Sequence, residues 1–353
     1  MRPILITGVG GLVGAACARH FARIRPVVGI DNDMRRTFFG QGASSAWQVD
    51  QLIQTLGSQF SCRDLDIRDQ PALSALFKLH NFAAVIHCAA QPSHDWAALN
   101  PTTDFAVNAT GTLTLLECAR ARAIDCVFVH LSTNKVYGDR PNELPLVELE
   151  SRFDLAPDHP HFAGIDETMP VDQCLHSLFG VSKLAADLLV QEYGRYFGLP
   201  TVCLRGGCLT GPGHSGAELH GFLSYLMKCT LDGTPYRVIG HGGKQLRDNL
   251  HCADLATLIG RIVEAPPIPG SVFNVGGGRV SAVSVQEAIA LAQTITGKTL
   301  RVSHKTLPRI GDHQWYITDN SRVQDQYPGW QPSRTAADIL ASIARELGER
   351  RQR

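Results

Sequence analysis

The chain has 353 residues, which is long enough to bury a large core and to form two domains or one enlarged domain. Its 33 basic and 33 acidic residues cancel, so it has no net charge to attract nucleic acid or an anionic membrane, and we expect neither as a partner. Ten cysteines are scattered without a Cys-x-x-Cys pair, which predicts reduced thiols and no metal site.

The cellular location is inferred from what the chain does not contain. No apolar run approaches the ~18 residues of a membrane helix. The chain begins with the apolar segment 4–6, which leaves no room for the basic and apolar regions of a signal peptide. We therefore expect a soluble, cytoplasmic protein.

The first half of the chain alternates short apolar runs with helical patterns. The apolar runs are at 3–7, 27–31, 83–90 and 126–132, and helices are expected at 12–24, 101–122 and 178–197. This alternation predicts an α/β fold, a Rossmann-type doubly wound parallel sheet with helices on both faces.

The second half is less regular. A polar, proline-containing stretch between 139 and 173 predicts a long loop of the kind that often binds ligands. From residue 204 onward glycine and proline clusters recur. We place one domain at 1–204, with a return of the chain near 246–275, and a smaller C-terminal domain mainly at 205–353.

Three glycines between the first strand and the first helix form a candidate dinucleotide site. Gly8 allows a tight turn, Gly11 lets the backbone approach a pyrophosphate, and Gly14 lets helix and strand pack closely. The phosphates would then lie at the start of the helix, beside Leu12 and Val13. A glycine trio alone is weak evidence, and its context strengthens it.

That context is Asp31, which ends the next strand and is followed by Asn32. A carboxylate there accepts the hydroxyls of the adenosine ribose and repels a 2′-phosphate, which favours NAD over NADP. Arg35 and Arg36 follow closely and leave NADP as a minority alternative.

Further candidate contacts to the cofactor have structural alternatives. The segment with Asp66 and Ile67 either clamps the adenine or is a turn with helix-capping acids. Asn108 is polar on an apolar helix face, where it serves as a structural bridge or a catalytic support. Small residues suited to a backbone beside the cofactor follow the strand near 85: Cys88, Ala89, Ala90 and Gln91.

Seven segments together carry a resemblance to a known family. They are 107–117 (Val-Asn-Ala-Thr-Gly-Thr-Leu-Thr-Leu-Leu-Glu), 131–139 (Leu-Ser-Thr-Asn-Lys-Val-Tyr-Gly-Asp), 179–183 (Phe-Gly-Val-Ser-Lys), 204–212, 242–255, 273–278 and 309–312. In this order they resemble the extended short-chain dehydrogenases/reductases that epimerise or dehydrate nucleotide sugars. Segments 132–139 and 243–248 are most similar to those of the CDP-paratose (CDP-tyvelose) 2-epimerases.

The resemblance implies a cofactor, a substrate and a reaction. NAD and a nucleotide-diphosphate sugar would bind, the first domain holding NAD and the second the sugar nucleotide. A sugar carbon would be oxidised transiently and the hydride returned. A homodimer would pack through the helices near 101–122 and 178–197.

The resemblance also implies roles for individual residues. Thr133 would hydrogen-bond the sugar hydroxyl, Ser132 would contact the cofactor, and Lys183 would bind the nicotinamide ribose. Arg247 and Arg309 would grip the diphosphate.

Two positions complete the expected substrate site. Asp312 would orient Arg309 or touch the sugar. A dehydratase would have an Asp-Glu pair after Thr133, whereas this chain has Asn134 and Lys135, so dehydration is disfavoured.

Phe179 is the departure that matters most for the chemistry. The family has a tyrosine four residues before the lysine as its proton acceptor, and a phenylalanine cannot take a proton. His94, Lys135 and His176 are candidate replacements, the last if the helix has already begun at that residue. A catalytically silent binder of NAD and nucleotide sugar, or an engineered substitution, are the alternatives.

Overall fold

The computed structural model describes residues 1–218, 220–308 and 311–352. The chain divides into two compact units. Unit 1 comprises Met1–Val136, Leu178–Arg205 and Leu255–Phe273, and unit 2 comprises Tyr137–Ser177, Gly206–Asp254 and Asn274–Arg353. The segment 137–177, which we expected in the first domain, belongs to unit 2, because its short strands and turns pair with residues of that unit.

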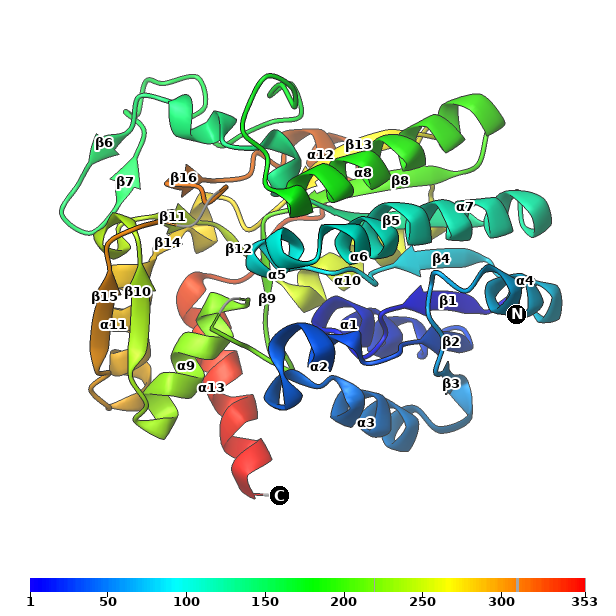
Figure 1. The fold of residues 1–353 in the computed structure, drawn as a ribbon, viewed down its shortest axis with the longest axis horizontal. Coiled ribbons are helices and arrows are strands. Elements are labelled where there is room, and N and C mark those ends of the chain that lie inside the picture. Colours follow the sequence, from blue (N-terminus) through cyan, green and yellow to red (C-terminus); the bar gives the residue numbers. More distant parts are fainter. Residues whose placement is uncertain (219, 309–310, 353) are drawn as a thin grey trace. The chain divides into compact units, whose positions relative to one another are not determined.

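Unit 1 is built on a seven-stranded sheet in the order β13-β8-β5-β4-β1-β2-β3 (Figure 1). Its strands are β1 (Ile4–Thr7), β2 (Val27–Ile30), β3 (Phe60–Arg63), β4 (Ala84–His87), β5 (Val127–Thr133), β8 (Thr201–Gly206) and β13 (Ser271–Val275). β1 pairs in parallel with both β2 and β4, so the strand order reverses at β1. Open α/β sheets bind ligands beyond the carboxyl ends of the strands at such a point. The predicted doubly wound sheet is confirmed.

Helices connect these strands. They are α1 (Leu12–Phe21), α2 (Met34–Phe39), α3 (Ala46–Leu56), α4 (Gln70–Leu79), α5 (His94–Leu99), α6 (Pro101–Phe105), α7 (Gly111–Arg122), α8 (Leu178–Phe197) and α10 (Cys252–Glu264). The single helix predicted at 101–122 is interrupted, because Ala106–Thr110 form a π-helical turn between α6 and α7. Such wider turns are rare and occur frequently at functional sites.

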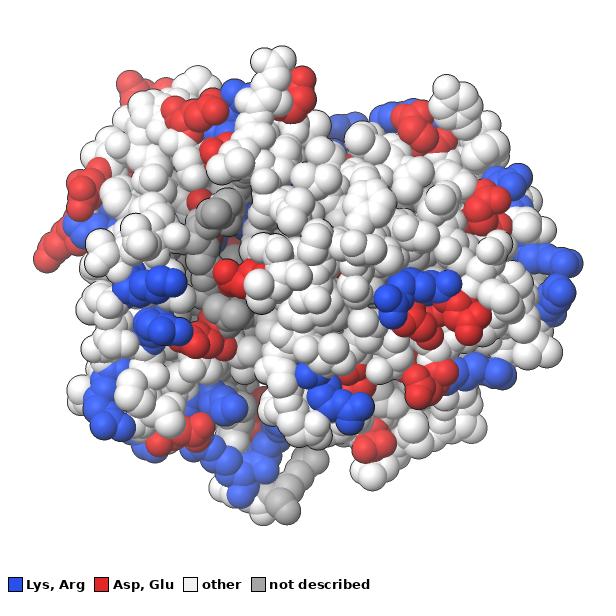
Figure 2. Space-filling view, viewed as in Figure 1, with Lys and Arg blue, Asp and Glu red and all other residues white. Residues whose placement is uncertain are grey.

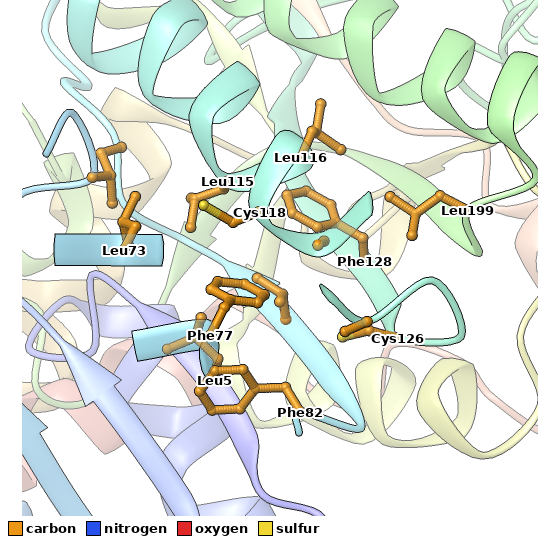
Figure 3. Packing of buried hydrophobic residues seen from close by; sticks show 14 of the residues in the cluster. Leu5, Leu73, Phe77, Phe82, Leu115, Leu116, Cys118, Cys126, Phe128 and Leu199 are labelled. Atoms are coloured by element: carbon orange, nitrogen blue, oxygen red, sulfur yellow. The ribbon is translucent and has the colours of Figure 1, made fainter. Parts of the chain in front are cut away.

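The core of unit 1 explains the uninterrupted apolar runs of its sequence. All four residues of β1 are buried, as expected for a parallel strand covered on both faces. Leu5 of this strand, Phe128 of β5 and Leu115 of α7 belong to one buried cluster, shown in Figure 3. The cluster makes the sheet a rigid support for the loops that follow its strands.

Unit 2 contains several small sheets and a helical layer. Its strands are β6 (Val147–Glu148), β7 (Phe153–Asp154), β9 (Cys208–Thr210), β10 (Tyr236–Ile239), β11 (Leu246–Arg247), β12 (Asn249–His251), β14 (Val283–Ser284), β15 (Val302–Lys305) and β16 (Trp315–Tyr316). Its helices are α9 (Phe222–Asp232), α11 (Val285–Thr296), α12 (Ser321–Gln326) and α13 (Ala336–Gln352). α9, α11 and α13 share a buried core. The loop predicted at 139–173 contains the antiparallel pair β6–β7.

The surface follows the charge balance of the sequence. On the face seen in Figure 2, acidic and basic side chains lie interspersed among uncharged residues. Within the described ranges, the longest helices lack the apolar length that crossing a membrane requires. The ten cysteines carry reduced thiols.

Candidate active site

The turn between β1 and α1 has no room for side chains. Gly8 has φ +65°, and a Cβ there would lie 2.8 Å from the backbone of Ala89. A Cβ on Gly14 would lie 2.3 Å from the Gly8 carbonyl oxygen. Gly11, the residue before α1, has no side chain to cap the first N–H groups of this ten-residue helix. The turn therefore fits a pyrophosphate, whose oxygens would accept hydrogen bonds from those N–H groups.

Asp31 lies at the edge of this turn. Its carboxylate accepts hydrogen bonds from the backbone N–H of Gly10 and of Asp33, both at 2.8 Å. Burial raises the pKa of Asp31. The guanidinium of Arg35 lies 4.9 Å from the centre of the Phe39 ring, and burial lowers the pKa of Arg35 to about 10. A carboxylate thus faces the glycine turn, as the sequence predicted for a ribose contact.

The acidic segment after β3 has two parts. Asp66 accepts a two-pronged hydrogen bond from Arg68, which lowers the pKa of Asp66, and a third bond from Asn32 at 3.0 Å. Asp69 caps α4 by accepting from Ala72 N–H at 3.0 Å. Ile67 packs where a Cβ on Gly111 would lie. The helix-capping interpretation therefore holds for Asp69. Asp66 is instead hydrogen-bonded to Asn32, which directly follows Asp31.

A buried set of polar side chains, here called the amide frame (Gln91, Asp104, Asn108 and Ser182), links the loop after β4 to α8. Asn108 Oδ1 accepts from Gln91 N–H at 2.9 Å, and Asn108 Nδ2 donates to Ser182 Oγ at 3.0 Å. The Gln91 side chain donates to Asp104 at 2.6 Å. All four residues are buried. The structural interpretation of Asn108 is the one these contacts favour, since its amide holds three elements together.

Lys183 occupies the centre of the β5–α8 edge, which we define as residues 130–133 and 179–187. Its Nζ donates to the Leu131 carbonyl oxygen at 2.7 Å and to His130 Nε2 at 3.4 Å. Burial lowers the pKa of Lys183 to about 8. Thr133 ends β5, and its Oγ1 accepts from Lys135 N–H at 3.2 Å. Lys183 is therefore bonded to β5 two residues before Thr133, which ends this strand.

Behind Lys183 lies a buried ion pair that the sequence analysis missed. Asp187 accepts from Arg205 at 2.9 and 3.1 Å and from Ser132 Oγ at 2.5 Å. Ser132 was predicted to contact the cofactor, and its hydroxyl donates its hydrogen bond to Asp187. The sequence did contain a signal for this ion pair. Asp187 is a charged residue four positions after Lys183, on a helix face that is otherwise buried.

Two buried histidines flank this edge. His87 Nδ1 lies 2.7 Å from Thr7 Oγ1 and Nε2 lies 2.9 Å from Thr112 Oγ1. Thr112 donates its own proton to the Asn108 carbonyl at 2.6 Å, so His87 carries its proton on Nε2. Burial lowers the pKa of His87 to about 3 and that of His130 well below its ordinary value. Both are neutral.

Phe179 is in the first turn of α8 and is 7 % exposed. The ring of His94 lies against it, with 5.0 Å between the ring centres and 62° between the planes. His176 precedes α8, which begins at Leu178, so it does not share a helical face with Phe179. Its Nε2 donates to the Val171 carbonyl at 2.7 Å. The condition under which His176 would share a helical face with Phe179 is not met, because the helix begins two residues later.

In unit 2 the predicted phosphate-binding residues are partly described. Arg247 Nη2 donates to Asp312 Oδ1 at 2.6 Å, and Nη1 donates to the Leu246 carbonyl at 2.8 Å. Arg309 lies outside the described residues. Asp312 therefore has Arg247 as a partner, which the sequence analysis did not anticipate.

Comparison with known proteins decides the family. Residues 4–276 match the model of the NAD dependent epimerase/dehydratase family. The chain belongs to this family. The predicted extended short-chain dehydrogenase family and the predicted cofactor, NAD, are thereby confirmed.

Individual relatives cover nearly the whole chain. CDP-paratose 2-epimerase of Salmonella typhi is 29% identical over 95% of this chain and 96% of its own. A dTDP-glucose 4,6-dehydratase of Neisseria meningitidis is 30% identical over 99% of this chain and 88% of its own. The family therefore includes similar relatives with two different reactions.

Many solved structures share the fold. One of them is a tyrosine-to-phenylalanine mutant of UDP-glucuronic acid 4-epimerase from Bacillus cereus, in complex with a fluorinated UDP-glucuronic acid and NAD. It superposes with a TM-score of 0.76, is 24% identical, and covers 98% of this chain and 99% of its own.

Proposed function

We propose that this chain is an NAD-dependent nucleotide-sugar epimerase, which oxidises one sugar carbon to a ketone and reduces it again from the other side. The observation that carries the proposal is the position of Lys183. Its Nζ is bonded to the Leu131 carbonyl, two residues before Thr133 at the end of β5. Lysine and threonine are the groups that flank the reacting hydroxyl in the family that the motifs resemble.

The geometry supports a role for each of these two residues. Bound NAD would supply the acceptor and donor of hydride. The Lys183 ammonium has three donors, of which the Leu131 carbonyl and His130 take two. The third is available to a hydroxyl of the nicotinamide ribose, and Thr133 would hydrogen-bond the sugar hydroxyl. With a pKa of about 8, Lys183 is mainly charged at neutral pH.

Epimerisation is favoured over dehydration by the residues that follow Thr133. Loss of water needs a group that protonates the leaving hydroxyl and a base at the neighbouring carbon. Asn134 is buried, and its amide can do neither. The similarity to a CDP-paratose 2-epimerase supports the same choice and suggests a CDP-sugar as substrate.

The diphosphate of the substrate would bind to Arg247, with Arg309 as the second arginine proposed from the sequence. A guanidinium matches a phosphate with two parallel hydrogen bonds. Asp312 accepts from one Arg247 nitrogen and is thereby placed to orient it. Removing this carboxylate would leave the arginine charged but less ordered.

We also propose a cytoplasmic homodimer. Apolar side chains of α6 and α8 are unusually exposed: Phe105 by 46%, Val181 by 44% and Leu188 by 44%. Val181 and Leu188 are seven residues apart and share one face of α8, which suits contact with a second copy. Ten reduced thiols fit a reducing compartment.

The test is product analysis with a panel of CDP-, UDP-, dTDP- and GDP-sugars in D₂O, followed by NMR. We expect one sugar to change configuration at a single carbon while that carbon keeps its protium, because the hydride returns from the cofactor. Release of water and a stable keto product would identify a dehydratase instead.

Phe179 favours a second candidate, a silent binder of NAD and nucleotide sugar. Calorimetric binding of both ligands without turnover, in the wild type and in Phe179→Tyr, would support it and overturn the epimerase proposal. Turnover by the wild type would exclude it.

A further inference from the structure

The ring of His94 is the titratable group seen beside Phe179. His94 begins α5, directly after the loop that follows β4, and it is half-buried. Its imidazole packs against the Phe179 ring in an edge-to-face arrangement, with 5.0 Å between the ring centres and 62° between the planes. An imidazole therefore stands next to the position where related enzymes carry a phenol.

The contact is held by the amide frame. Ser182 Oγ donates to the Phe179 carbonyl at 3.0 Å and accepts from Asn108, which in turn accepts from Gln91 N–H. The Gln91 side chain then grips both backbone groups of Ser93, accepting from its N–H at 2.5 Å and donating to its carbonyl at 2.9 Å. His94 is the next residue.

This chain of bonds is buried from end to end. Because each amide is satisfied, it fixes the backbone of the loop against the first turn of α8. The backbone segments that carry the two rings are thus fixed relative to each other, and this would preorganise a reacting group at their contact.

The other candidates lack these properties. His176 lies outside α8, and its Nε2 donates a hydrogen bond to the Val171 carbonyl. A lysine ammonium such as that of Lys135 has donors and no acceptor. His87 and His130 are fully buried within the sheet. An imidazole has both a donor and an acceptor nitrogen, so it can accept a proton and return it.

We propose that His94 replaces the missing tyrosine as the proton acceptor and donor at the sugar oxygen, an inference that rests on the proposed function. NAD, when bound, would supply the acceptor and donor of the hydride. The His94 imidazole would take the hydroxyl proton as C–O–H becomes C=O, and would return the same proton to the oxygen when the ketone is reduced from the opposite face. No other co-reactant is needed.

The first test is His94→Gln, which keeps a polar side chain but cannot exchange a proton. We expect kcat to fall by about 10²–10⁴ while the Kd for NAD stays unchanged. His304→Gln, at an exposed histidine of β15, is the matched control and should keep full turnover.

The second test asks whether the two residues do the same task. Phe179→Tyr restores the phenol, so the double variant Phe179→Tyr/His94→Gln should turn over like Phe179→Tyr alone. If the phenol does not rescue His94→Gln, the histidine is needed for something other than the proton, and the proposal is wrong.

A measurement independent of turnover checks the geometry. In NMR spectra of the protein without ligands, the His94 ring protons should be shifted by the Phe179 ring and should move in Phe179→Leu. The pH at which this resonance titrates should match the rising limb of kcat/KM, and that limb should move to a different pH in the double variant, where the phenol is the base.

The outcomes separate the two proposals. Turnover by His94→Gln at the wild-type rate would overturn the role of His94 and leave the epimerase intact. Absence of turnover in the wild type and in Phe179→Tyr, on every sugar of the panel, would overturn the proposed function itself.

Discussion

The turn between β1 and α1 and the β5–α8 edge differ in what holds them in shape. The turn is defined by backbone contacts, since a Cβ on Gly14 would lie 2.3 Å from the Gly8 carbonyl. The edge is defined by buried polar side chains, with Lys183 bonded to the Leu131 carbonyl and Asp187 paired with Arg205. The turn keeps its shape because glycines let backbone segments pack closely. The edge keeps its shape because its buried polar side chains form hydrogen bonds and an ion pair with one another.

The difference teaches where change is tolerated. A backbone-defined turn has no substitute for glycine, and here the family pattern is intact. At the edge, side chains rather than backbone contacts set the shape, and the His94 ring packs against Phe179 there.

The largest expected effect is at the ion pair of the edge. Arg205→Met leaves Asp187 buried and uncompensated, because both side chains are almost fully buried. We expect a loss of about 3–5 kcal/mol in the free energy of unfolding, measured by urea titration. Arg195→Met, at an exposed pair with Glu192 on the same helix, should cost less than about 1 kcal/mol. Equal losses of unfolding free energy in the two variants would show that burial of the Arg205–Asp187 pair does not matter for stability.

A smaller effect is expected at the turn. Gly14→Ala forces a methyl group against the Gly8 carbonyl, which should cost about 1–3 kcal/mol and weaken NAD binding measured by calorimetry. Gly348→Ala in α13 is the control, because nothing lies within 4 Å of its added methyl group. That variant should gain about 0.5–1 kcal/mol. A Gly14→Ala protein as stable as the wild type would contradict the close packing.

A third effect is a pH dependence at Lys183. Its pKa is about 8 in the folded state and ordinarily 10.5, so between these values the unfolded chain binds one more proton than the folded protein. Stability must then rise with pH over this window, by about 3 kcal/mol at about 1.36 kcal/mol per pKa unit. The stability of the wild type relative to Lys183→Met should therefore increase from pH 8 to pH 10.5 and be constant below pH 7. A flat difference throughout would show that Lys183 is not desolvated.

Much of the molecule follows from local patterns in the sequence. Glycines 8, 11 and 14 and the carboxylate of Asp31 are close in the chain, so spacing alone predicts the cofactor turn. The buried parallel strands are legible as apolar runs because both of their faces are covered. The same patterns and the resemblance that they support identified the family, NAD and the unusual Phe179.

Only the tertiary structure decided what surrounds Phe179. His94 is 85 positions away in the sequence, and no periodicity relates it to α8; the sheet and the amide frame bring the two rings together. The π-helical turn at Asn108, the pairing of Asp187 with Arg205 and that of Arg247 with Asp312 were also invisible, because each depends on elements far apart in the chain. The sequence by itself determined that a phenylalanine stands four residues before Lys183, and the fold decided that the His94 ring lies beside it, because long-range packing sets side-chain neighbours.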